Sequence, residues 1–116
     1  MEIYHGTGKG QALRIQKNGY MKPANTGEEK MSVSFTDDIN YARYYAEVKG
    51  GLDMAILKTK LSDKFKLSAR IRNNQGVEYI TFDHVSADDL DILADDGKWH
   101  PLTKWNVLYN EPLNKL

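Results

Sequence analysis

Every apolar segment of this 116-residue chain is short, and glycines or polar turns separate each segment from the next. The segments predicted to be strands alternate in polarity or are rich in β-branched residues, and they cover 2–5, 32–36, 54–61, 64–67 and 77–82, with a last strand or two in the tail. Helices are predicted over 11–18 and 39–49, where glycines follow, and a short helical turn over 88–93 after Ser86. Because these elements interleave without a regular βαβ period, the pattern favours a single α+β domain over residues 1–116.

The composition narrows the classes of function. Sixteen Lys and Arg balance sixteen Asp and Glu, so the chain lacks the strongly basic character typical of nucleic-acid binders. It has no cysteine, which excludes disulfides and thiolate-ligated metals, and its three histidines are scattered, so no metal site is expected. No apolar run approaches the roughly 18 residues of a membrane span, and the first residues lack a signal-peptide pattern. We expect a cytoplasmic monomer without a membrane partner.

Three residues stand out, although each has an ordinary structural explanation. His5 ends a strand, where a histidine is usually structural. Tyr45 shares a predicted helix face with Ala42 and Ala46, which is typical of a core aromatic residue. Glu78 lies in a strand whose alternation buries one face, whereas most carboxylates stay solvated. The order of these residues along the chain, with their neighbours, suggests a shared function.

The sequence runs His-Gly-Thr at 5–7, then Ser-Phe-Thr-Asp at 34–37 with Tyr45 ten residues beyond the Phe, then Glu-Tyr-Ile-Thr-Phe-Asp at 78–83. This series resembles the catalytic domain of the ADP-ribosyltransferases, and most closely the His-Tyr-Glu branch, which is diphtheria-toxin-like and poly(ADP-ribose)-polymerase-like. The resemblance covers about residues 1–93. It implies two small, mostly antiparallel sheets packed at a steep angle, short flanking helices, and a cleft for NAD.

The resemblance also implies which residues bind NAD. His5 would hydrogen-bond the adenosine ribose, and the backbone of Gly6, with Thr7 beside it, would hold the nicotinamide carboxamide. A glycine at position 6 would let the ligand approach the main chain closely. Tyr45 would stack on the nicotinamide ring, and Tyr41, one turn earlier, would help to wall the pocket.

The resemblance implies that Glu78 is the catalytic carboxylate, assisted by His5 and Tyr45. It would accept a hydrogen bond from the nicotinamide ribose and stabilise the positive charge that develops as the glycosidic bond breaks. The same carboxylate could orient or deprotonate an acceptor nucleophile. Ser34 would also line the NAD site, where this branch often has a tyrosine. NAD is the co-substrate of this reaction, and no metal is needed.

Two loops complete the expected site. Residues 21–30 correspond to the family's flap over the dinucleotide, where Lys22 or Lys30 could meet a phosphate. Residues 70–75 correspond to its acceptor-recognition loop. Gly76 stands where arginine-modifying and asparagine-modifying transferases carry Glu and Gln, so neither protein-acceptor signature is present.

The leading hypothesis is a small mono-ADP-ribosyltransferase, a toxin or phage effector, that acts on an unknown host protein or nucleic acid. One alternative is a catalytically impaired module of the same fold that binds NAD, ADP-ribose or a partner. Another is RNA 2′-phosphotransferase chemistry, which would require several basic residues to converge on a phosphate. Trp99 and Trp105 in the tail are interpreted as core residues rather than as a base-stacking surface for nucleic acid.

Overall fold

The structure, a computed structural model, describes residues 1–26, 28, 30–68 and 76–113. Its helices are α1 (Lys9–Asn18) and α2 (Ile39–Gly50), and its short 3-10 turns are η1 (Gly51–Asp53), η2 (Ala87–Asp89) and η3 (Leu102–Lys104). Its strands are β1 (Glu2–Gly8), β2 (Tyr20–Met21), β3 (Val33–Thr36), β4 (Met54–Lys60), β5 (Lys66–Leu67), β6 (Glu78–Thr81), β7 (Val85–Ser86), β8 (Asp91–Leu93), β9 (Trp99–Pro101), β10 (Trp105–Asn106) and β11 (Glu111–Pro112).

The strands form a principal sheet with the order β5-β6-β3-β1-β4-β8-β9, and two small sheets, β2 with β7 and β10 with β11. All the strand pairs in these sheets are antiparallel, which confirms the predicted α+β class with mostly antiparallel sheets. The principal sheet has two halves. They meet where Tyr4 of β1 pairs with Thr36 of β3, whereas β1 pairs with β4 along its whole length. Pairing therefore joins the two expected sheets into one.

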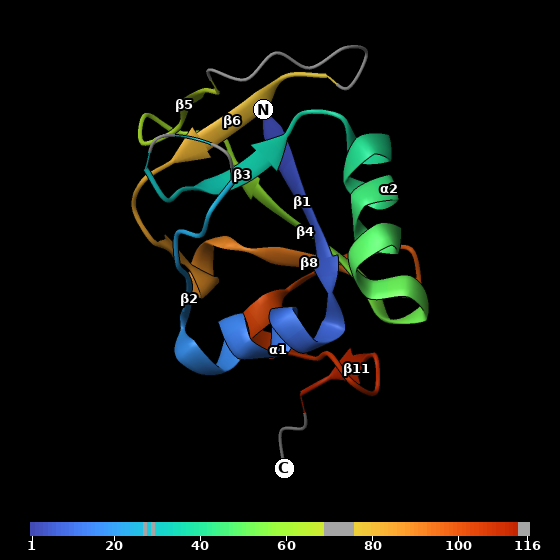
Figure 1. Cartoon of the computed structure of the whole chain (residues 1–116). Coiled ribbons are helices and arrows are strands. Elements are labelled where there is room, and N and C mark those ends of the chain that lie inside the picture. Colours follow the sequence, from blue (N-terminus) through green and yellow to red (C-terminus); the bar gives the residue numbers. More distant parts are fainter. Residues whose placement is uncertain (27, 29, 69–75, 114–116) are drawn as a thin grey trace.

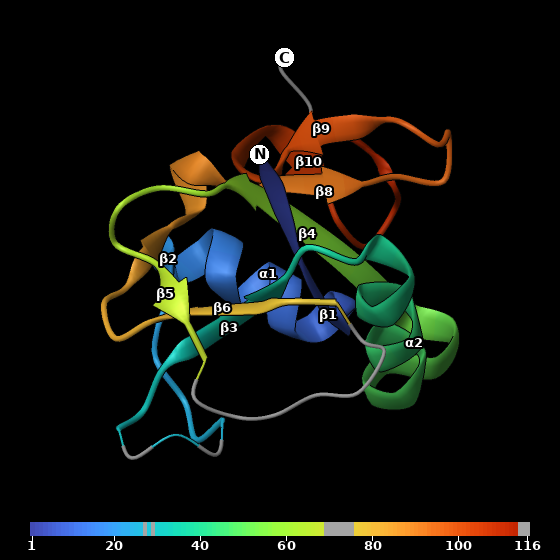
Figure 2. The same cartoon turned by 90° about the horizontal axis from the view of Figure 1, so that it is seen from above.

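The two helices cover different parts of this sheet (Figures 1 and 2). α1 carries the buried Ala12 and Ile15 into the main core, which also contains Phe35, Leu57 and Leu90. α2 packs against β1 and β4 through Ala42 and Ala46, which form a smaller cluster with Ile56. The small alanine side chains allow the helix to lie very close to the strand beneath it.

Local sequence signals account for both helix ends. α1 ends before Gly19, whose φ of 89° is the left-handed conformation that glycine adopts most easily, and its N–H donates to the Ile15 carbonyl. α2 begins after Asp38, whose carboxylate accepts from the backbone N–H groups of Asn40 and Tyr41. Both predicted helices are confirmed, with α1 two residues longer at its start.

The helix predicted over 88–93 is wrong in its second half. Ser86 does accept from the Asp88 N–H, but the helical turn stops at Asp89, and Asp91–Leu93 is strand β8. Leu90 and Ile92 are both buried, and β8 pairs with β4. The alternation of buried residues and the pairing with the edge of β4 therefore favour a strand here, despite the helix-start signal at Ser86.

The tail supplies part of the core, as predicted. The Trp105 side chain is 6% exposed within the main core cluster, and its indole Nε1–H donates to Asn110 Oδ1 at 3.2 Å. Trp99 is partly buried and packs near Tyr4, with ring centroids 5.9 Å apart. Trp105 is thus a core residue and not a surface for base stacking. Across the described residues, neither helix is long and apolar enough to cross a membrane.

Candidate functional site

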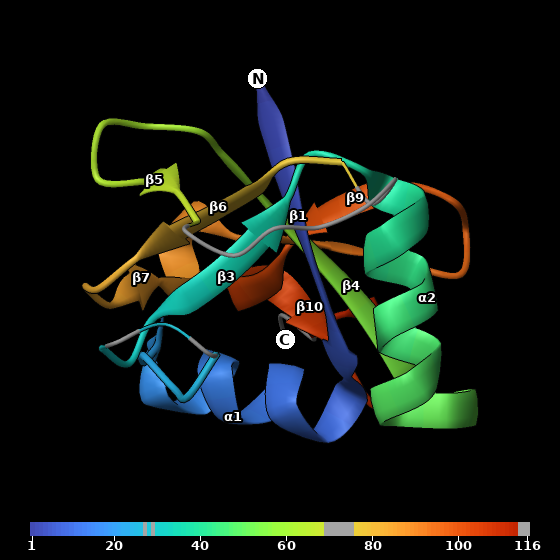
Figure 3. The ribbon, with the colours of Figure 1, turned by 45° about the horizontal axis from the view of Figure 1, so that its top comes forward.

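A cleft of about 950 Å³ is lined by residues of β1, β3, α1 and α2 and of the segment that follows β2. Figure 3 shows how β1, β3, α1 and α2 are arranged. The lining of the cleft includes all the residues that the sequence analysis assigned to catalysis and to the ribose and nicotinamide parts of NAD: His5, Gly6, Thr7, Ser34, Tyr41, Tyr45 and Glu78. These residues come from β1, β3, α2 and β6. The fold therefore brings together side chains that are as far apart in the chain as His5 and Glu78.

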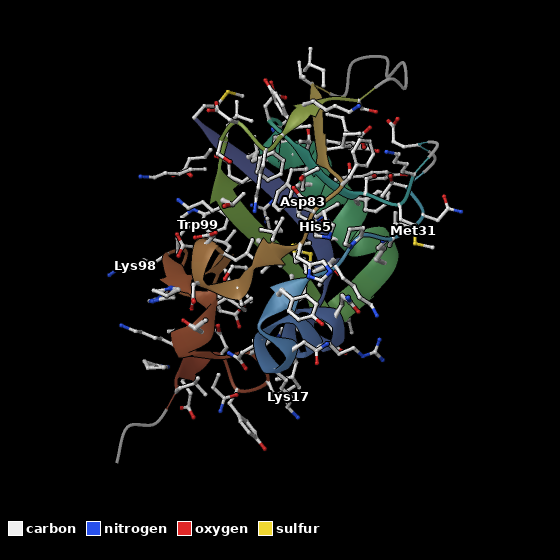
Figure 4. The ribbon with its side chains drawn as sticks, turned by 90° about the vertical axis from the view of Figure 1, so that its left-hand side faces the viewer. His5, Lys17, Met31, Asp83, Lys98 and Trp99 are labelled. Carbon is white, nitrogen blue, oxygen red and sulfur yellow. The ribbon has the colours of Figure 1, made fainter. Side chains whose placement is uncertain are left out.

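His5 is held in one orientation by the neighbouring strand. Its Nδ1 lies 2.7 Å from the backbone carbonyl oxygen of Ser34. Because a carbonyl can only accept, Nδ1 carries the proton and the neutral ring keeps Nε2 as an acceptor. Burial lowers the pKa of His5 below its ordinary value of 6.5, and the nearby Lys49 ammonium lowers it further, against the opposing hydrogen bond to Ser34. In Figure 4, His5 lies near the middle of the view, whereas Met31 and Lys17 lie toward its margin.

Glu78 is buried at 8% exposure, at the start of β6. The Ser34 hydroxyl donates to its Oε2 from the adjacent strand β3. The Glu78 backbone carbonyl accepts from the Ser68 N–H at 2.9 Å, on the other side of β6. The ordinary interpretation, a solvated glutamate, is therefore wrong: the carboxylate is a buried group with a hydroxyl partner in the cleft.

Tyr45 lines the cleft from α2. It is not the core aromatic residue that its helix face suggested, because Ala42 and Ala46 are buried while Tyr45 is 40% exposed. Its ring centroid lies 6.1 Å from that of Tyr41 and 4.8 Å from the Lys49 Nζ. The cleft thus has a partly exposed aromatic ring with the Lys49 ammonium over one of its faces.

The packing of α2 on β1 requires a glycine at position 6. A Cβ built on Gly6 would collide with the carbonyl oxygen of Ala42 and lie 2.7 Å from the backbone nitrogen of Ala46. The missing side chain thus leaves room for α2. The predicted contact of the Gly6 backbone with a carboxamide is a separate matter and stays a prediction.

The cleft also contains charged residues that sequence reasoning missed: Lys9, Arg14, Lys49 and Asp53. Lys49 could have been found, since it lies one helical turn after Tyr45 and so shares its face. Lys9 and Arg14 lie on α1, the helix that follows the His-Gly-Thr strand. The cleft is therefore lined by four basic residues and two acidic ones: Lys9, Arg14, Lys22, Lys49, Asp53 and Glu78.

The two lysines proposed for phosphate contact differ in position. Lys22 lines the cleft. Lys30 does not, and its Nζ lies 5.5 Å from the centroid of the Phe82 ring. The acceptor-recognition loop predicted over 70–75 falls outside the described residues. Among the residues that are described, no group of three or more His, Asp or Glu side chains gathers as a metal site.

Comparisons of the chain with protein-family models, with curated proteins and with solved structures each gave no match. The chemistry of the cleft must accordingly be argued from its own residues.

Proposed function

We propose that the protein is a small mono-ADP-ribosyltransferase that cleaves NAD at the nicotinamide–ribose bond and transfers ADP-ribose to a macromolecular acceptor in the cytoplasm. One observation carries the proposal: His5, Tyr45 and Glu78 line one cleft of about 950 Å³. That volume is at the upper end of the roughly 300–1,000 Å³ usual for small-molecule sites, and NAD is a large ligand of this class.

The cleft residues fit the parts of NAD. The neutral His5 ring presents Nε2 as an acceptor for a ribose hydroxyl, because Nδ1 is engaged by Ser34. Tyr45 offers an accessible ring for the nicotinamide. Lys9, Arg14 and Lys22 supply positive charge for the diphosphate.

Glu78 is suited to the bond-breaking step. The ribose becomes positively charged as nicotinamide leaves, and a carboxylate held in place stabilises that charge without reorganising. Ser34 holds one carboxylate oxygen, so the group is oriented before the substrate binds. The same carboxylate can then accept a proton from the attacking acceptor.

The test is nicotinamide release and transfer of labelled ADP-ribose to protein and nucleic-acid fractions of a lysate. Glu78→Gln should lower release by about 100-fold or more while NAD still binds, since removal of a group that stabilises transition-state charge commonly costs this much. Tyr45→Ala should chiefly weaken NAD binding. Matched controls lie on the same helix outside the cleft: Glu47→Gln, and Tyr44→Ala, whose ring is 60% exposed.

Three outcomes are distinguishable. Release that depends on Glu78 supports the enzyme. NAD binding measured by calorimetry without any release supports the binding module instead. If the folded protein neither binds NAD nor releases nicotinamide with any of several lysates, both hypotheses are wrong.

A second candidate activity is RNA 2′-phosphotransfer. The observation in its favour is the convergence of Lys9, Arg14, Lys22 and Lys49 on the cleft, which the net charge of zero did not indicate. Incubation with NAD and 2′-phosphorylated RNA decides it, because removal of the phosphate onto ADP-ribose supports this chemistry and unchanged RNA excludes it.

A further inference from the structure

The strand that carries Glu78 is tied to the start of α2 by the side chain of Asp37. The β3–β6 register pairs Ser34 with Ile80 and Thr36 with Glu78, so its next position sets Asp37 opposite Val77. The Asp37 N–H donates to the Val77 carbonyl at 3.1 Å, as a regular antiparallel ladder requires. The return bond is unusual: the Val77 N–H donates to Asp37 Oδ1 at 2.7 Å, and not to a backbone carbonyl.

This substitution occurs where the chain has to leave the sheet. Asp38, the next residue, already caps α2, and its Oδ1 accepts from the Asn40 N–H at 2.9 Å. The carboxylate of Asp37 therefore completes the ladder at the point where the backbone turns into the helix. Two adjacent carboxylates thus join β6, which carries Glu78, to α2, which carries Tyr45.

Gly76 leaves room for this contact. Its φ is +72°, which favours glycine, and a Cβ built there would collide with Asp37 Oδ1 and lie 2.8 Å from the Cβ of Asp38. A longer side chain such as Glu or Gln at position 76 would occupy the space that the Asp37 carboxylate fills. The glycine and the aspartate are therefore complementary.

We propose that Asp37 is a positioning residue for Glu78, because its carboxylate replaces a backbone carbonyl at the end of the β3–β6 ladder and holds the start of β6 against α2. This inference rests on the proposed function for its catalytic consequence. A carboxylate that shifts by about 1 Å from its working position can lose on the order of 100-fold in rate. Binding of NAD, by contrast, depends on His5, Tyr45 and the basic side chains, which Asp37 does not hold directly.

The experiment compares Asp37→Ala with Asp37→Asn, whose amide oxygen can still accept from Val77. The matched control is Asp83→Ala, two residues beyond the other end of β6 (Asp83 is labelled in Figure 4). In Asp37→Ala, the Val77 amide should exchange with solvent at least about tenfold faster. Its kcat for nicotinamide release should fall by about 10- to 100-fold, with the KM for NAD within about twofold. Asp37→Asn should restore most of the kcat, and Asp83→Ala should behave as wild type.

Two results would overturn the proposal: an unchanged kcat in folded Asp37→Ala, or an Asp37→Asn variant as impaired as Asp37→Ala. If Asp37→Ala does not fold, Gly76→Ala replaces it, because the added Cβ displaces the carboxylate without removing it, and the same fall in kcat is expected. If wild type releases no nicotinamide, the proposed function fails separately. Asp37 is then judged by Val77 exchange and by the carboxyl chemical shift of Glu78, and no change in either for Asp37→Ala refutes its positioning role.

Discussion

The hydroxyl of Ser34 donates to Glu78 Oε2 across two neighbouring strands, while the carbonyl of the same serine accepts from His5 Nδ1. One residue of β3 therefore orients both His5 and Glu78. In the sequence, Ser34 was a departure from the family pattern. In the structure, Ser34 connects His5, which is proposed to bind the ribose, to Glu78, the proposed catalytic carboxylate.

Ser34→Ala removes only the hydroxyl bond and leaves the carbonyl bond to His5. We expect kcat for nicotinamide release to fall by about tenfold, since a hydrogen bond to a charged group contributes about 1.5–3 kcal/mol when it is fully used. The double variant Ser34→Ala/Glu78→Gln should be no slower than Glu78→Gln alone, because both changes act on one group. Additive losses would show that Ser34 acts independently of Glu78.

The stability of the protein should depend on pH through His5. Its folded-state pKa lies below 6.5, so below about pH 6.5 the unfolded chain binds a proton that the folded chain does not. The free energy of unfolding should therefore decrease as the pH falls from 7 toward 5, by up to about 1.4 kcal/mol per pH unit from this group. Urea unfolding at several pH values measures the slope, and His5→Gln should lose this part of it. An identical slope in His5→Gln would contradict the assignment.

Lys22 and Lys30 form a matched pair for testing the phosphate contact. Lys22 lines the cleft, whereas Lys30 lies against Phe82 outside it. We expect Lys22→Ala to raise the Kd for NAD by about fivefold to tenfold, as befits one charge-assisted contact, and Lys30→Ala to leave it unchanged. Calorimetry at low and moderate salt measures the Kd of both variants. Equal effects of the two changes would contradict a contact between Lys22 and the diphosphate of NAD.

Gly6→Ala should destabilise the fold, because the new Cβ would collide with the backbone of α2 at Ala42. We expect a loss of about 3 kcal/mol or more, since backbone atoms cannot move aside as a side chain can. Gly10→Ala on α1 is the control: a Cβ there meets nothing within 4 Å, and alanine should stabilise the helix slightly. Thermal unfolding compares the two, and similar midpoints would contradict the close packing of β1 and α2.

Trp105→Ala tests the role of the tail. Its side chain belongs to the main core, so truncation should cost about 3–5 kcal/mol. Leu108→Ala, at an exposed position three residues later, should change the stability by less than about 0.5 kcal/mol. Denaturant unfolding checks both. A Trp105→Ala variant as stable as wild type would mean that the tail does not complete the core.

The helices were predictable because their ends are marked by single residues, Asp38 and Gly19, whose effects are local. The error over 88–93 arose where local and distant forces compete. Ser86 does start a helical turn, but β4 offers an unpaired edge to the residues that follow. Tyr45 shows the same limit: helical spacing placed it on an apolar face, and only the packing of α2 on β1 shows that the alanines alone reach the core.

The sequence by itself determined the α+β class, both helices and the three candidate residues, because periodicity, capping and short motifs depend on neighbours along the chain. Only the tertiary structure decided that His5, Tyr45 and Glu78 share one cleft, that Ser34 and Asp37 hold the carboxylate strand, and that four basic side chains face the same space. The physical reason is that strand register and helix packing set these contacts between segments up to 73 positions apart (78 minus 5), and no local pattern encodes which edges will pair.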